Sequence, residues 1–418
     1  MRWSRASASR PARRRAVVSV IGGPGSGSAR RPAAVYRTPP RRWRVAARRC
    51  YIPASREEPP MISSDTLADL LETLVNIPSE TGHEAAIADW MAARLGALGR
   101  GEVQRTGQSL AWRGPRGRAA RPLVVLAGHL DTVPANGNAT ARRDSGRLYG
   151  LGSSDMKGGD VVLLALLESL DPARLRFDLA AVFYDAEEGP AAGNGLGRVL
   201  RELPWLAEAR LAILLEPTDL RVELGCIGTM NAEVRVTGKS AHSARPWLGV
   251  NAVARAAPWL AEVTRFPVTP VQVGGVEYRE TLQVTTLHAG RARNVVPDEL
   301  TVNLNYRFPP DRTLDQAEAR LKALVPSEFG FAVVDRAAAG QVCADLPEVA
   351  EFVQRFGAKV TGKQGWTDVA RFTAAGVPAF NFGPGIPEQA HQADEYCPLE
   401  NLDVAYRWLA QFLSEAAR

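Results

Sequence analysis

Apolar residues recur along this chain with two different periods, and the period changes near residue 228. Before that point, short continuous apolar runs alternate with segments in which apolar residues return every three or four positions. The runs are typical of buried parallel strands, and the longer period is typical of amphipathic helices that pack on them. We therefore predict an α/β domain with a mixed, largely parallel sheet and helices on both faces. The predicted strands are 123–127, 179–184 and 211–215, and the predicted helices are 67–74 (capped by Ser64 and Asp65), 85–98 and 161–170.

Beyond about Gly228, single apolar and polar residues alternate, as expected for strands with one exposed face. The order of elements here, β-α-β-β-α, predicts a small antiparallel domain of the α+β (ferredoxin-like) type, inserted into the first domain. We assign residues 229–338 to this insertion, and residues 61–228 and 339–418 to the first domain. The predicted elements are strands 230–237, 282–287 and 300–308 with helices 251–263 and 314–325, then helix 346–356, strand 379–381 and a last helix from Leu402.

The first 60 residues carry most of the positive charge. They contain 15 Arg and two Glu, whereas the other 358 residues hold 36 Lys and Arg against 43 Asp and Glu. The net charge of +6 thus hides a mildly acidic body, which disfavours nucleic acid as a partner of that body. We predict that residues 1–60 form a disordered basic extension, because they lack apolar periodicity. A non-essential extension upstream of Met61 is favoured over a targeting peptide, a twin-arginine signal at Arg13-Arg14, or an anchor for nucleic acid or anionic lipid.

The cysteines and the apolar runs bear on the compartment. None of the four cysteines has CxxC spacing, which suits a reducing compartment and requires no disulfide. No apolar run approaches the roughly 20 residues that a membrane-spanning helix needs. We therefore expect a cytoplasmic protein with no membrane partner.

Histidines and carboxylates gather where the predicted elements end. His129 and Asp131 follow the first strand, and in an extended chain they project to the same side because alternate residues share a face. Each candidate alone is more simply read as a structural histidine or an ordinary turn, and only their combination indicates a metal site. Two histidines and three carboxylates suit two Zn²⁺ ions that share one bridging carboxylate. The five candidate ligands are His129, Asp155, Glu188, Glu216 and His391.

The neighbouring residues Glu187 and Glu188 add a candidate catalytic group. Adjacent side chains diverge, so one carboxylate can bind metal while the other faces the reacting water. Zinc lowers the pKa of its bound water to about 7, and a carboxylate can take that proton and pass it on. We predict that Glu187 is the general acid/base and that Asp131 hydrogen-bonds the ring of His129 or a neighbouring group and so supports the site. Without the other ligands, the acidic pair would be read as a solvated turn.

Five motifs together resemble the zinc-dependent aminoacylase/carboxypeptidase family, and the resemblance runs in order from about residue 63 to 417. They read HLDTVP, SSDMKGG, AEEG, EPT and AHQADE. The resemblance implies that His129 and Glu216 bind one Zn²⁺, that Glu188 and His391 bind the other, and that Asp155 bridges them. It also implies that Co²⁺ can substitute for zinc.

The inserted segment resembles the family's lid and dimerisation domain through the sequence GKSAHSARP at 238–246. The resemblance implies a homodimer, in which His242 reaches the active site, commonly that of the partner subunit, and stabilises an oxyanion. It implies that Asn294 and Arg307 contact a substrate carboxylate, for which a guanidinium is well matched. Thr367 lies in a turn that borders the substrate pocket in the family. That turn reads GWTD here, where many members have Gly-Thr-Ser-Asp.

Within the family, the sequence looks most like the succinyl-diaminopimelate desuccinylase branch of high-GC Gram-positive bacteria. This implies hydrolysis of N-succinyl-LL-2,6-diaminopimelate, a small N-acyl amino acid, in lysine synthesis. The alternatives are an acetylornithine deacetylase or a related metallo-dipeptidase or carboxypeptidase. A non-catalytic binding module is disfavoured because all five ligands and both supporting carboxylates are present.

Overall fold

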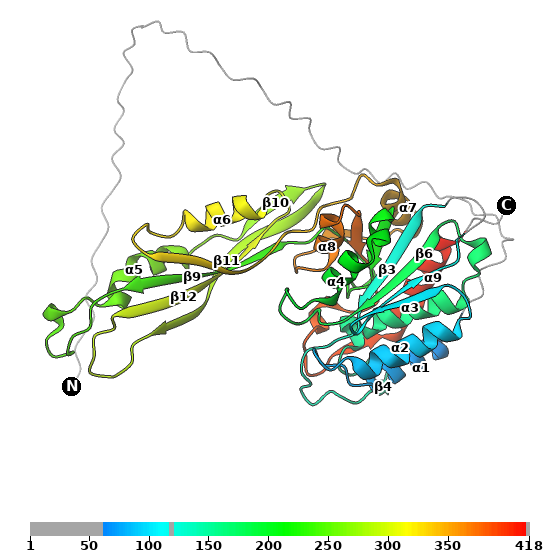
Figure 1. Cartoon of the computed structure of the whole chain (residues 1–418), viewed down its shortest axis with the longest axis horizontal. Coiled ribbons are helices and arrows are strands. Elements are labelled where there is room, and N and C mark those ends of the chain that lie inside the picture. The colour runs from blue at the N-terminus through cyan, green and yellow to red at the C-terminus, as the bar shows by residue number, and fades with distance from the viewer. Residues whose placement is uncertain (1–61, 117–120, 415–418) are drawn as a thin grey trace, which may run out of the picture. The chain divides into compact units, whose positions relative to one another are not determined.

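The computed structural model describes residues 62–116 and 121–414, and these form two larger sheets and one small one (Figure 1). The first sheet is mixed and has eight strands in the order β1-β2-β6-β3-β7-β15-β8-β14. Its central strands β6, β3, β7 and β15 run parallel to one another. The strands are β1 (Glu102–Thr106), β2 (Ser109–Arg113), β3 (Leu123–His129), β6 (Asp178–Tyr184), β7 (Leu211–Leu214), β8 (Val222–Leu224), β14 (Val360–Gly362) and β15 (Ala379–Asn381).

Strand β3 shows why this sheet carries helices on both faces. Every residue of β3 after Leu123 is buried, and alternate side chains enter two different apolar clusters. Val124 and Leu126 join the first cluster, whereas Val125 and Ala127 join the second. The first cluster packs under α1 (Ser64–Val75), α2 (Ala85–Ala97), α3 (Gly158–Ser169), α7 (Pro347–Phe356) and α9 (Leu399–Leu413), and the second under α4 (Gly195–Glu202) and α8 (Val369–Ala374). The predicted α/β architecture is thereby confirmed.

The second sheet has five antiparallel strands in the order β10-β11-β12-β9-β13. One face packs on two helices, and the other is polar, with the side-chain amides of Asn303 and Asn305 donating to Asn231. Without the edge strand β10, the order and connections are those of a ferredoxin-like fold, as predicted. The elements are β9 (Gly228–Thr237), α5 (Ala252–Val263), β10 (Thr269–Val273), β11 (Val276–Ala289), β12 (Glu299–Phe308), α6 (Leu314–Lys322) and β13 (Gly330–Ala337).

A buried ion-pair network ties this second sheet to α6. The carboxylate of Glu280, 2% exposed, accepts hydrogen bonds from Tyr306, Arg312 and Arg320. Burial alone would raise the pKa of Glu280, but its arginine and tyrosine partners lower that pKa below its usual value. The network therefore stabilises the charged form of a carboxylate that could not otherwise be buried.

Several predicted details were wrong at the ends of elements or incomplete. Ser63, and not Ser64 or Asp65, caps α1, because its hydroxyl accepts from the Thr66 amide. The last helix begins at Leu399 and not at Leu402, and the helix predicted over 314–325 ends at Lys322. We missed the hairpin of β1 and β2, because β1 is only partly buried and has no apolar run. The prediction for residues 1–60 lies outside the described residues.

No helix in the described part of the chain is long and apolar enough to cross a membrane. Cys226, Cys343 and Cys397 are free thiols. The boundaries assigned to the inserted domain stay a prediction.

Candidate metal centre

The predicted ligands gather at the carboxyl edge of the first sheet. His129 is the last residue of β3, Glu187 and Glu188 follow β6, and Glu216 follows β7. These three strands are adjacent and parallel, so their carboxyl ends open onto one edge. Such an edge is where open α/β sheets place their ligands. The topology thus brings together residues that are up to 87 positions apart in the sequence.

Asp155 stands between the two predicted ligand histidines. Its Oδ1 lies 3.2 Å from His129 Nε2, and its Oδ2 lies 3.8 Å from His391 Nε2. His391 Nε2 also lies 3.0 Å from Glu188 Oε1. Ligand atoms of His129, Asp155 and Glu188 all fall within 4.8 Å of one another. Each oxygen of Asp155 therefore faces a different imidazole, as a carboxylate shared by two cations would.

The backbone that presents Asp155 is held by Glu395, a residue that the sequence did not single out. The Glu395 carboxylate accepts from the amides of Gly152, Ser154 and Asp155 at 2.9, 2.8 and 3.0 Å. Burial raises the pKa of Glu395 to about 7. The only sequence signal was its place at the end of the AHQADE motif, four residues after His391. Glu395 thus fixes a turn that no local pattern specifies.

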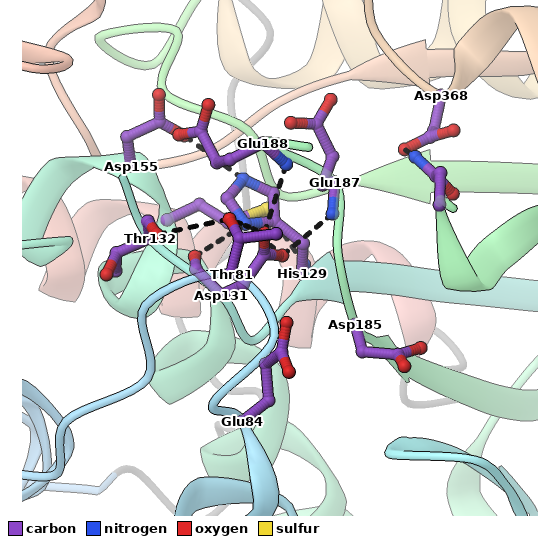
Figure 2. Close-up of polar contacts among 12 residues, drawn as sticks. Thr81, Glu84, His129, Asp131, Thr132, Asp155, Asp185, Glu187, Glu188 and Asp368 are labelled. Carbon is purple, nitrogen blue, oxygen red and sulfur yellow. Dashed lines mark hydrogen bonds and ion pairs between the residues drawn. The ribbon is translucent and has the colours of Figure 1, made fainter. Parts of the chain in front are cut away.

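Asp131 is fully buried and orders the acidic turn after β6 (Figure 2). Its Oδ1 accepts from the Glu187 amide at 2.9 Å, and its Oδ2 accepts from the Glu188 amide at 3.0 Å and from Thr81 Oγ1 at 2.9 Å. The ring of His129 contacts both the main chain and the side chain of Asp131. Its Nδ1 lies 3.0 Å from the backbone carbonyl of Asp131 and 3.6 Å from the carboxylate. The residue orients His129 mainly through its main chain, and its side chain holds Glu187 and Glu188.

The electrostatics of the site favour a bound cation. Burial raises the pKa of Glu216 to about 7 and that of Glu187 well above its usual value. Burial alone would lower the pKa of His129, but its hydrogen bond with Asp155 and the surrounding carboxylates raise it well above normal. In the described part of the chain, Glu216 Oε1 is buried without a hydrogen-bond partner. Leaving a buried carboxylate oxygen unpaired is costly, so this set of imidazoles and carboxylates fits divalent metal ions.

The other predicted site residues are not joined to this cluster by a hydrogen bond in the described part of the chain. His242 lies in a loop of the second sheet, where its Nδ1 accepts from the Ala244 amide at 3.0 Å. Asn294 accepts, through its carbonyl, from the Ser243 amide, so it lies beside His242. Arg307, on β12, donates to Asn305 Oδ1 at 3.2 Å. Thr367 is buried and lies 3.2 Å from Asn381 Oδ1.

Comparisons with known proteins agree with this arrangement. The sequence model of "Peptidase family M20/M25/M40" matches residues 125–415. The chain is 42% identical over 347 residues to a putative succinyl-diaminopimelate desuccinylase of Mycobacterium tuberculosis, covering 82% of this chain and 97% of that protein. It is 39% identical over 363 residues to a succinyl-diaminopimelate desuccinylase of Corynebacterium glutamicum, covering 84% and 98%. Among solved structures, aminopeptidase PepT from Bacillus cereus matches with a TM-score of 0.71 at 18% identity, over 84% of this chain and 98% of that one, a likeness of fold.

Proposed function

This chain belongs to peptidase family M20/M25/M40, and on that premise we propose that it hydrolyses N-succinyl-LL-2,6-diaminopimelate to succinate and LL-2,6-diaminopimelate. As a member of this family it is a metal-dependent amide hydrolase. The observation that carries the finer proposal is the 42% identity to the Mycobacterium protein over 97% of that protein's length. The reaction would serve lysine synthesis in the cytoplasm, where thiols stay reduced.

We assign the metal-binding roles as the motifs imply. His129 and Glu216 would hold one Zn²⁺, Glu188 and His391 the other, and Asp155 would bridge them, with Co²⁺ able to take the place of zinc. The separate contacts of the two Asp155 oxygens with His129 and His391 support this division. When bound, zinc supplies a Lewis acid for the amide carbonyl and lowers the pKa of water to about 7.

Glu187 then has the role of proton carrier. Its backbone amide donates to Asp131, and its carboxylate interacts electrostatically with His129 and Glu216. Burial raises the pKa of Glu187 well above its usual value, so the carboxylate has a high proton affinity for its type. It would take a proton from the attacking water and return it to the leaving amine.

We propose that His242 donates a hydrogen bond to the developing oxyanion, and that a second copy of the chain supplies it in a homodimer formed through the inserted domain. The Ala244 amide donates to His242 Nδ1, so the proton of the neutral ring is on Nε2. The loop therefore leaves a donor free, and a lost donor of this kind costs about 3 kcal/mol of transition-state stabilisation. Asn294 beside it, with Arg307 and Thr367, would contact the substrate.

Steady-state kinetics with a panel of substrates tests the proposal. The zinc-loaded protein is assayed with N-succinyl-LL-2,6-diaminopimelate, N-acetylornithine and a set of dipeptides. We expect kcat/KM for the succinylated compound to exceed the others by at least about 100-fold, the discrimination that two well-placed contacts can provide. A preference for N-acetylornithine or for dipeptides would replace the proposed substrate, and no turnover of any compound would favour a binding module.

A further inference from the structure

Lys363 is a buried lysine beside the metal centre to which the motifs assign no role. It directly follows β14, and its main chain is held on both sides: its amide donates to Leu224 O at 3.3 Å, and its carbonyl accepts from Ile227 at 3.1 Å. The side chain is only 12% exposed. A lysine that is so far from solvent needs acceptors for its ammonium group.

The ammonium group has two such acceptors, and they belong to different parts of the sheet edge. Its Nζ lies 2.8 Å from Glu223 Oε2, and it donates to the carbonyl oxygen of Pro217 at 3.3 Å. Glu223 is on β8 and is itself 10% exposed, so the ion pair is fixed at both ends. Lys363 thus links β8 to the residue that follows Glu216.

The segment that carries Glu216 is also held by hydrogen bonds before and after Pro217. Before it, the Leu215 amide donates to Ala127 O at 2.9 Å. After it, Thr218 exchanges hydrogen bonds with Gly383, which packs so closely that a Cβ there would come 2.4 Å from Glu216 O. Pro217 has no amide hydrogen, so its carbonyl oxygen is the main-chain group through which this residue can be held by a hydrogen bond. Lys363 occupies that carbonyl.

We propose that Lys363 is a positioning residue, which holds the backbone at Pro217 so that the Glu216 carboxylate is aimed at the metal centre. Its positive charge also faces a site that is rich in carboxylates, where it offsets their mutual repulsion. The inference rests on the proposed di-zinc function. The role of Lys363 concerns how one metal ligand, Glu216, is held. Residues that orient metal ligands typically contribute about 10- to 100-fold to metal affinity.

The test compares zinc binding by Lys363→Met, Lys363→Arg and the double variant Lys363→Met/Glu223→Gln with wild-type protein. Each full-length protein is titrated with zinc against a chromophoric chelator, which resolves two binding steps. The double variant is included because Lys363→Met alone leaves Glu223 as an unpaired buried charge, which can impair folding. Lys359→Met, at an exposed lysine four residues earlier, is the matched control.

We expect Lys363→Met and Lys363→Met/Glu223→Gln to bind one zinc about 10- to 100-fold more weakly, with the other binding step unchanged. Lys363→Arg, which keeps a cationic donor, and Lys359→Met should stay within about threefold of wild type by the same reasoning. Wild-type affinity for both zinc ions in the double variant would overturn the inference. A loss of zinc affinity in Lys363→Arg equal to that in Lys363→Met would overturn it as well.

The titration needs no substrate, so its outcome separates this inference from the proposed function. A wild-type protein that binds two zinc ions but does not cleave the succinylated substrate would refute the proposed substrate alone. Unchanged affinity in the Lys363→Met proteins would refute the role of Lys363 alone.

Discussion

Replacing Asp131 by asparagine tests how the acidic turn is held, because the change alters hydrogen bonding with almost no change in shape. The carboxylate accepts three hydrogen bonds, one at Oδ1 from the Glu187 amide and two at Oδ2 from the Glu188 amide and Thr81. An asparagine has one acceptor oxygen. The favoured side-chain orientation keeps that oxygen at the Oδ2 position, where it accepts two hydrogen bonds. The NH₂ group then faces the Glu187 amide, which loses its acceptor.

The magnitude follows from this count. One charge-assisted hydrogen bond is lost, at about 1.5–3 kcal/mol, and the two that remain become neutral and weaken by about 1 kcal/mol each. Removing a negative charge from this acidic site offsets part of the loss. We therefore expect a net cost of about 2–4 kcal/mol, which appears as lost stability if the turn stays in place. If the turn moves instead, Glu187 is displaced, and kcat falls about tenfold for each 1.4 kcal/mol added to the activation free energy.

Two measurements together detect the effect, whether it is a loss of stability or a loss of catalytic rate. Urea unfolding of the metal-free protein gives the change in the free energy of unfolding, and kcat of the zinc-loaded protein gives the catalytic loss. Thr81→Val is the matched control, because it removes one neutral donor, keeps both amide bonds and should cost about 1 kcal/mol. An Asp131→Asn protein within about 0.5 kcal/mol of wild type, and with kcat within about threefold, would refute the reasoning.

Four further outcomes are expected. Glu187→Gln should keep both metal ions while kcat falls about 100- to 10,000-fold, as metal analysis and kinetics will show, and wild-type turnover would remove Glu187 from the mechanism. Glu395→Gln removes an acceptor from the turn that presents Asp155, so zinc affinity should fall about 10- to 100-fold in a competition titration. Glu280→Gln should lower the free energy of unfolding by about 3 kcal/mol at pH 7, as measured by urea unfolding. Because its partners lower the pKa of Glu280, the difference between wild type and variant should persist above about pH 5 and shrink as the pH falls below about 4. Chelation should abolish activity and lower the melting temperature in calorimetry, and added Zn²⁺ or Co²⁺ should restore both; activity that survives complete metal removal would contradict the assignment.

The sequence by itself determined the layered architecture, and its motifs indicated the chemistry through their resemblance to a known family. Continuous apolar runs such as 123–127 are typical of strands covered by helices on both faces, and single alternation after residue 228 is typical of a sheet with one solvent-exposed face. The same patterns place His129, Glu188 and Glu216 at strand ends, because the apolar run must stop before a polar group can begin. Local periodicity therefore sufficed for these features.

Only the tertiary structure decided which groups hold one another. Glu395 bonds to amides about 240 residues earlier in the chain, and Lys363 reaches Pro217 across nearly 150 residues. Asp131 uses its carbonyl for His129 and its carboxylate for the turn after β6, a division of roles that no spacing encodes. The periodicity of apolar residues in a sequence indicates which side chains are buried, because the buried face of a helix or strand recurs at a fixed spacing along the chain. It does not report the partner of a buried polar group, because that partner is set by how distant strands and turns pack.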